Sequence, residues 1–106
     1  MAVITATDET YDELLSASEY VVVDYYGDHC GACLYLEPFF QEASNNLPLI
    51  SFIRINITHN PEIRRRYKID GVPTLKFFRS GEEVHMAMGG MDADHLEQHI
   101  SKMLYD

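Results

Sequence analysis

Two cysteines separated by two residues are the side chains of this sequence best suited to chemistry. Cys30 and Cys33 are the only cysteines among 106 residues, and they lie where an apolar, strand-like run changes to a helical pattern. A thiolate is the nucleophile in disulfide exchange, and a free cysteine, with a pKa of about 8.5, holds little of it at neutral pH. The unpaired N–H groups at the start of a helix stabilise that anion. We therefore predict that Cys30 is the exposed attacking thiol and Cys33 the more sheltered resolving thiol.

Two other roles for the cysteine pair stay open at this point. A Cys-x-x-Cys pair can be half of a zinc site, but such a site needs two further donors. The sequence offers His29 beside the pair and no second cysteine pair. The cysteines could also be buried and inert, although Gly31 between them favours a close backbone approach over packing. Redox chemistry is the interpretation that we favour.

A single acidic residue, Asp24, interrupts the apolar run from 21 to 26. Such a run is typical of a central strand that is covered on both faces. Burial of a carboxylate in that strand should raise its pKa toward neutrality. Asp24 could then take a proton from Cys33 when that sulfur must attack. The alternative is a structural aspartate that pairs with Arg54 on the neighbouring strand, and the two roles can coexist.

A proline precedes one of the predicted strands, in the segment Gly71-Val72-Pro73-Thr74. A proline at a strand entry is often an edge or turn residue. If the Val72–Pro73 bond is cis, however, it exposes the backbone groups of Val72 to an extended peptide. Gly89 and Gly90 end the last predicted strand, where they fit an ordinary turn.

The charge balance excludes several classes of partner. The net charge is −9, from 17 acidic and 8 basic residues, and a strongly anionic surface repels nucleic acid and anionic lipid. The N-terminal residues have no basic side chain, and no apolar stretch approaches the roughly 18 residues of a membrane span. We therefore expect a cytoplasmic monomer with no nucleic-acid or membrane partner.

The hydrophobic pattern alternates between the periods typical of strands and of helices. We expect strands at 3–5, 20–26, 50–57, 74–79 and 83–88, and helices at 7–16, 31–46, 60–67 and from 92. Thr7 would cap the first helix, and His95 and His99 would be exposed on the last. Helices between early strands imply parallel pairing, and the turn at Ser80-Gly81 implies an antiparallel hairpin. The prediction is one α/β domain over residues 1–106, with a mixed sheet of about five strands between about four helices, in the order βαβαβαββα.

Over essentially its whole length the sequence resembles the thioredoxin family. Residues 21–33, VVVDYYGDHCGAC, are similar to the family's strand, buried acid and CGPC motif, and residues 68–75, KIDGVPTL, to its cis-proline segment. Pro38 matches the proline inside the following helix, and Gly89 the glycine that flanks the substrate groove. Arg54 falls where many members have a basic residue near the buried acid. The resemblance implies the thioredoxin fold.

The resemblance also implies an activity, that of a protein-disulfide reductase and electron carrier. Cys30 would attack a disulfide in a substrate protein, and Cys33 would resolve the mixed disulfide. A thioredoxin reductase, an equivalent electron donor or a small thiol would then recharge the dithiol. The redox-active Cys30–Cys33 disulfide makes a separate cofactor or metal unnecessary.

Four departures from the family pattern surround the cysteine pair. The chain has no tryptophan, and His29 and Tyr26 stand where the family has its two tryptophans. Ala32 replaces the proline between the cysteines, and Leu34 replaces a lysine after the second cysteine. We hypothesise that protonated His29 lowers the pKa of Cys30 and that Ala32 leaves the turn less rigid. Both changes would make the potential more oxidising. A disulfide isomerase or oxidase is therefore an alternative, as is a non-catalytic peptide- or metal-binding module.

Overall fold

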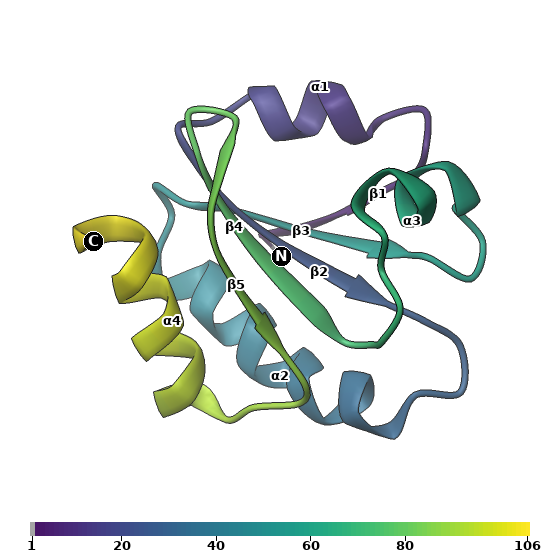
Figure 1. Cartoon of the computed structure of the whole chain (residues 1–106). Coiled ribbons are helices and arrows are strands. Elements are labelled where there is room, and N and C mark those ends of the chain that lie inside the picture. The colour runs from purple at the N-terminus through teal and green to yellow at the C-terminus, as the bar shows by residue number, and fades with distance from the viewer. Residues whose placement is uncertain (1) are drawn as a thin grey trace.

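The computed structural model describes residues 2–106 and is built around one five-stranded mixed sheet (Figure 1). Its strand order is β1-β3-β2-β4-β5. The first three strands in this order are parallel, and β2–β4 and β4–β5 are antiparallel. The strands are β1 (Val3–Ala6), β2 (Tyr20–Tyr26), β3 (Ser51–Asn56), β4 (Thr74–Arg79) and β5 (Glu82–Met88).

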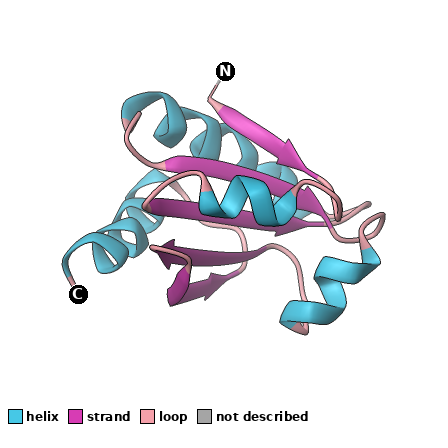
Figure 2. Cartoon of the chain, turned by 90° about the horizontal axis from the view of Figure 1, so that it is seen from above, coloured by secondary structure: helices cyan, strands magenta, loops and turns pink. Residues whose placement is uncertain are grey.

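Four helices cover the two faces of this sheet (Figures 1 and 2). They are α1 (Tyr11–Ser16), α2 (Gly31–Asn46), α3 (Pro61–Tyr67) and α4 (Ala93–Tyr105). One layer is formed by α2 and α4, and the opposite layer by α1 and α3. The element order and the mixed sheet therefore confirm the fold class predicted from the sequence.

The apolar run of the central strand β2 is continuous because both faces of the strand are covered by helices. Because successive side chains point to opposite faces, Val22 packs in the core under α2 and α4, whereas Val21 and Val23 pack in the core under α1 and α3. All three valines are fully buried. The odd and even positions thus contribute to two separate cores, and the side chain of Asp24 falls on the α2 side.

The start of α1 differs from the sequence prediction. Thr7 does not cap the helix, because residues 7–10 form a turn in which the Thr7 carbonyl accepts the N–H groups of Thr10 and Tyr11 at 3.1 and 3.0 Å. The helix begins at Tyr11, and Thr10 occupies the N-cap position. Thr7 therefore begins the turn that precedes the helix, and it is not the N-cap expected from its position before the apolar pattern.

One of the two histidines predicted to be exposed on the last helix is instead partly buried. His99 Nδ1 lies 2.8 Å from Nε2 of His85, which comes from β5. Both rings also pack against Phe77. His95, by contrast, is exposed as predicted and contacts Asp92, the N-cap of α4. Helical periodicity places His99 on one side of α4, but only the sheet supplies its partner.

Within residues 2–106, no helix has the length and apolar character required to cross a bilayer.

Candidate active site

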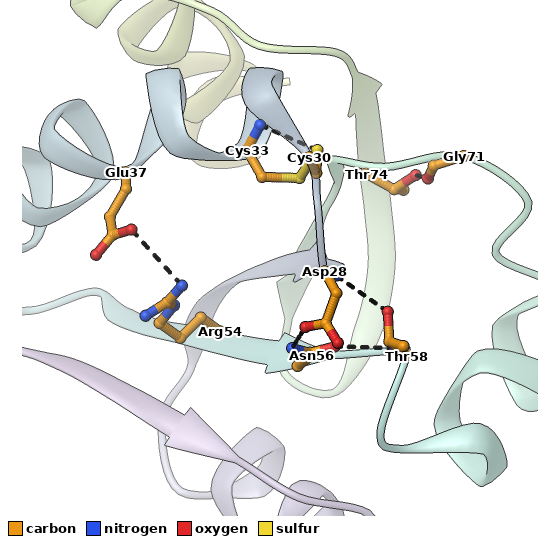
Figure 3. The surroundings of a disulfide bond; sticks show 9 residues. All are labelled: Asp28, Cys30, Cys33, Glu37, Arg54, Asn56, Thr58, Gly71 and Thr74. Atoms are coloured by element: carbon orange, nitrogen blue, oxygen red, sulfur yellow. Dashed lines mark hydrogen bonds and ion pairs between the residues drawn. A yellow bond between two sulfur atoms is a disulfide. The ribbon is translucent and has the colours of Figure 1, made fainter.

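The two cysteines form a disulfide at the N-terminus of α2 (Figure 3). Cys30 is the N-cap residue, and its sulfur accepts the backbone N–H of Cys33 at 3.1 Å. Cys33 is 6% exposed, whereas Cys30 is only partly buried. The sulfur at Cys30 is thus the one nearer to solvent, and it already contacts an amide of the helix N-terminus that can stabilise a negative charge.

A set of polar contacts anchors the loop that leads from β2 to Cys30 (Figure 3). The backbone N–H of Asp28 donates to Thr58 Oγ1 at 3.1 Å. Its carboxylate accepts Asn56 Nδ2 at 2.9 Å and lies 2.7 Å from His59 Nε2. The hydrogen bond from Asn56, followed by that from His59, lowers the pKa of Asp28. Sequence reasoning missed these residues, because the partners lie about thirty positions further along the chain.

The carboxyl group of Asp24 is buried on the α2 side of β2. The residue is 3% exposed, and among the described residues its Oδ1 has no hydrogen-bond partner. Burial raises the pKa of Asp24 to about 7, with the Arg54 charge opposing and the Glu37 charge reinforcing this change. This direction is the one expected from the sequence. A carboxyl group with such a pKa can both accept and release a proton near neutrality.

Arg54 lies beside Asp24 in the register of β2 and β3 but contacts other groups. Its guanidinium is 4.0 Å from the centre of the Tyr26 ring, and Nη2 is 3.8 Å from Oε2 of Glu37. Within the part of the chain that the structure describes, no ion pair joins Arg54 to Asp24. Arg54 is directed to Glu37 instead, and it acts on Asp24 only through its charge, which favours the ionised carboxylate.

An open pocket of about 400 Å³ extends from the disulfide to Glu37 and Arg54. Its lining includes Cys30, Cys33, Glu37, Arg54 and Tyr26. Solvent in this pocket therefore has access to both the sulfurs and the Glu37–Arg54 pair.

The loop before β4 lies on another side of the disulfide, and its Val72–Pro73 bond is cis. Thr74 Oγ1 donates to the Gly71 carbonyl at 2.7 Å, and the Pro73 carbonyl accepts the Gly89 N–H at 2.9 Å. Val72 itself is only partly buried. The geometry considered from the sequence, a cis bond at this proline, is therefore present.

Glycine is required at the two positions after β5 for different structural reasons. Gly89 has a φ of +93°, a conformation that favours glycine. At Gly90 a Cβ atom would lie 2.9 Å from the carbonyl oxygen of Ala32, so a side chain there would collide with the backbone between the cysteines. The sequence identified Gly89 as the groove residue. The closer neighbour of the disulfide turn is Gly90, and no local signal distinguished the two.

Large apolar side chains are exposed around this turn. Leu34, Tyr35 and Met88 are 70%, 53% and 57% exposed. Leu34 lines the pocket beside the cysteines, while Tyr35 and Met88 line a second hollow with Gly90. Exposed apolar groups gathered at one site are typical of a surface that binds another protein.

A sulfur that is near solvent, that lies at a helix N-terminus and that has a bonded partner three residues away can exchange its disulfide with one in another molecule. The surrounding apolar side chains suit a protein as that other molecule. Fold and site together therefore define a thiol–disulfide oxidoreductase.

Comparisons with known proteins identify the family. Residues 2–102 match the thioredoxin family model. Thioredoxin 1 of Plasmodium falciparum is 29% identical over 96% of this chain and 97% of its own length, and the thioredoxin of Chlamydia muridarum is 31% identical over 96% and 98%. A solved structure of Plasmodium falciparum thioredoxin superposes with a TM-score of 0.86 at 27% identity, covering 100% of both chains. The chain belongs to the thioredoxin family, and it is a protein-disulfide reductase with a redox-active Cys-x-x-Cys disulfide.

Among residues 2–106, no group of three or more His, Cys, Asp or Glu side chains is arranged to hold a metal ion.

Proposed function

We propose that Cys30 is the attacking thiol and Cys33 the resolving thiol of this reductase. The Cys30 thiolate bonds to one sulfur of a substrate disulfide, and the other substrate sulfur leaves with the electron pair and takes up a proton. Cys33 then bonds to Cys30 and releases the second substrate thiol. The greater exposure of Cys30 and its contact with the Cys33 amide support this assignment.

Asp24 is the proton acceptor for Cys33 in this proposal. When Cys33 attacks, its thiol proton passes to the Asp24 carboxylate, directly or through a water molecule. The support is that Asp24 is buried on the side of β2 that faces α2, and that its pKa is raised to about 7. An aspartate with an ordinary pKa would be a weak base for a thiol.

The substrate is an extended segment of another protein that includes a disulfide. Its backbone pairs with Val72 beside Pro73, and it passes Gly31 and Gly89 on either side of the disulfide. Tyr26 and Arg54 line the pocket on the α2 side. A thioredoxin reductase or an equivalent donor returns the dithiol to its reduced state. A cytoplasmic location and a monomeric state stay predictions from the sequence.

His29 and Ala32 make the potential more oxidising than that of an ordinary thioredoxin. Protonated His29, next to Cys30 in the chain, favours the thiolate and hence the reduced form. Ala32 has no ring that fixes φ, so the disulfide turn is less constrained. Equilibration with glutathione for the wild type and for His29→Trp tests this proposal. An unchanged or more oxidising potential in the variant would remove His29 from it.

The cysteine assignment is tested by trapping with a protein disulfide. In Cys33→Ser the mixed disulfide on Cys30 should accumulate, because no second sulfur is available to resolve it. In Cys30→Ser no such adduct should form, since the remaining thiol is buried. Mass spectrometry of both reduced variants measures the adduct. Adducts on Cys33 that equal those on Cys30 would reverse or abolish the assignment.

A further inference from the structure

One charged group in the active-site pocket has no part in the proposed cycle. Glu37 lies on α2, one turn beyond Cys33, and lines the same pocket as both cysteines. Its side chain is 39% exposed, and its Oε2 lies 3.8 Å from Nη2 of Arg54 (Figure 3). Glutamate is common in the first turns of a helix. Glu37 is unusual because its ion-pair partner, Arg54, is also the register neighbour of the buried Asp24.

The arrangement around Arg54 shows what this partner would do without Glu37. Arg54 is the register neighbour of Asp24, and the alternation of β2 and β3 places both side chains on the α2 side of the sheet. A guanidinium in that position is the natural partner for a buried carboxylate, whose Oδ1 is otherwise without a hydrogen bond among the described residues. Instead it stacks over Tyr26 and extends toward Glu37. Glu37 and Tyr26 thus compete with Asp24 for one cation.

We propose that Glu37 is a positioning residue that sets the charge state of Asp24, by holding Arg54 away from the Asp24 carboxylate and by adding a second negative charge on the same side of the sheet. The inference deepens the proposed function, because its catalytic consequence rests on Asp24 accepting the Cys33 proton. The effect of Glu37 on the charge of Asp24 does not depend on disulfide exchange. It involves only the side chains of Asp24 on β2, Arg54 on β3 and Glu37 on α2.

The direction of the effect follows from the charged groups that act on Asp24. Arg54 acts on it from β3 and Glu37 from α2, while its neighbour in β4 is the apolar Leu75. Burial is the largest influence on the carboxyl group, Arg54 favours its ionised form, and Glu37 favours its protonated form. If the Glu37 charge is removed, one repulsion is lost and Arg54 is released toward Asp24. Both changes favour ionised Asp24.

The consequence for the exchange reaction is a shift of its working pH. Asp24 can accept the Cys33 proton only when it is ionised, so the Glu37 charge moves the acid limb of the resolving step upward toward neutrality. Glu37 also makes ionised Asp24 a stronger base, since its proton affinity is higher.

The experiment follows the Asp24 carboxyl carbon by ¹³C NMR in the oxidised protein, with its disulfide intact and without any substrate. In Glu37→Gln the midpoint of the Asp24 titration should fall by about half a pH unit. Glu37→Asp keeps the charge and should restore most of the wild-type midpoint. Glu42→Gln, an exposed position on the same helix, is the matched control and should leave the midpoint unchanged.

A midpoint in Glu37→Gln equal to that of the wild type would overturn the inference, as would an equal shift in Glu42→Gln. Thermal unfolding of the three variants shows that the fold is retained. Because the titration involves no exchange, its result is independent of the cycle proposed above. Loss of trapping in Cys33→Ser would sink that cycle and leave the titration standing, whereas an unmoved midpoint would sink only the role of Glu37.

Discussion

Two neighbouring residues of β2, Asp24 and Tyr25, bury polar atoms on opposite faces of the sheet and in opposite ways. Tyr25 is fully buried under α1 and α3, and its hydroxyl lies 2.6 Å from that of Tyr11. The ring of Tyr67 packs against both. Asp24 is almost as deeply buried under α2, yet one of its oxygens has no partner within residues 2–106.

The difference shows how one strand separates stability from chemistry. Burial raises the pKa of Tyr25 and of Tyr11, so both stay neutral, and the hydrogen bond between them gives each hydroxyl oxygen a partner. A satisfied polar pair in a core makes a modest net contribution and rigidifies its surroundings. The charge of Arg54, in contrast, compensates only part of the cost of burying ionised Asp24, so that the ionised form destabilises the fold. That instability is what brings its pKa to the range in which a thiol proton can be transferred.

Replacement of Asp24 should have the largest effect of any change on either face. Asp24→Asn keeps the size of the side chain but cannot accept the Cys33 proton, so the resolving step should slow by about 100- to 10,000-fold at neutral pH. Stopped-flow measurement of mixed-disulfide decay reports that step directly. The matched change on the opposite face, Tyr25→Phe, should leave the rate unaltered. Equal slowing by both would remove the functional distinction between the two faces.

The pH dependence of stability should come mainly from the same carboxyl group. Its pKa is 3.8 in an unfolded chain and about 7 in the fold, so the native state binds more protons between these values. The contribution of Asp24 to stability should therefore be largest in acid, fall by about 4 kcal/mol as the pH rises from about 4 to about 7, and then level off. Urea unfolding at a series of pH values measures it. Asp24→Asn should flatten this part of the curve, and an unchanged slope in the variant would assign it to other groups.

The tyrosine pair should matter for stability alone. Tyr25→Phe leaves the buried Tyr11 hydroxyl without its neighbour, and the expected cost is about 1–3 kcal/mol. The double change Tyr11→Phe with Tyr25→Phe removes both hydroxyls and should cost less than the sum of the single changes. Denaturant unfolding of the three variants measures the coupling. Strict additivity would show that the two hydroxyls do not act as a pair.

The partly buried pair of His85 and His99 should give the smallest effect. Burial, followed by the charges of His85, His95 and Lys102, lowers the pKa of His99. The unfolded chain therefore binds more protons than the fold near and below pH 6.5, so the contribution of His99 to stability is full above that pH and is lost as the pH falls. The loss should be less than about 1 kcal/mol, because His99 is only partly buried. His99→Gln should remove it, and an unaltered acid limb in that variant would contradict the assignment.

Most of the fold was predictable because its signals are local. The range of β2, the whole of α2 with Cys30 before it, and the hairpin at Ser80-Gly81 follow from apolar periodicity and turn residues within short windows. The start of α1 was wrong, since Thr7 is as good a turn residue as a cap and a single sequence does not separate the two roles.

Less of the site was predictable, because its contacts join distant elements. Burial of Asp24 followed from its place in an apolar strand. The ion-pair partner of Arg54 was not predictable, because Arg54 is placed near both Asp24 and Glu37. Only the packing of α2 on the sheet decides between them. The anchoring of Asp28 by residues after β3, and the contact of Gly90 with Ala32, have the same origin.

The amino-acid sequence by itself determined the elements, the position of the two sulfurs at a helix N-terminus and the insertion of one carboxyl group into an apolar strand. Each of these depends on residues within about one helix length of one another. Tertiary structure decided which polar groups meet: Arg54 with Glu37 and His85 with His99, while Asp24 Oδ1 has no hydrogen-bond partner among residues 2–106. Hydrogen bonds and charges act over a few ångströms, so their pairing exists only once the sheet and helices have brought distant residues together.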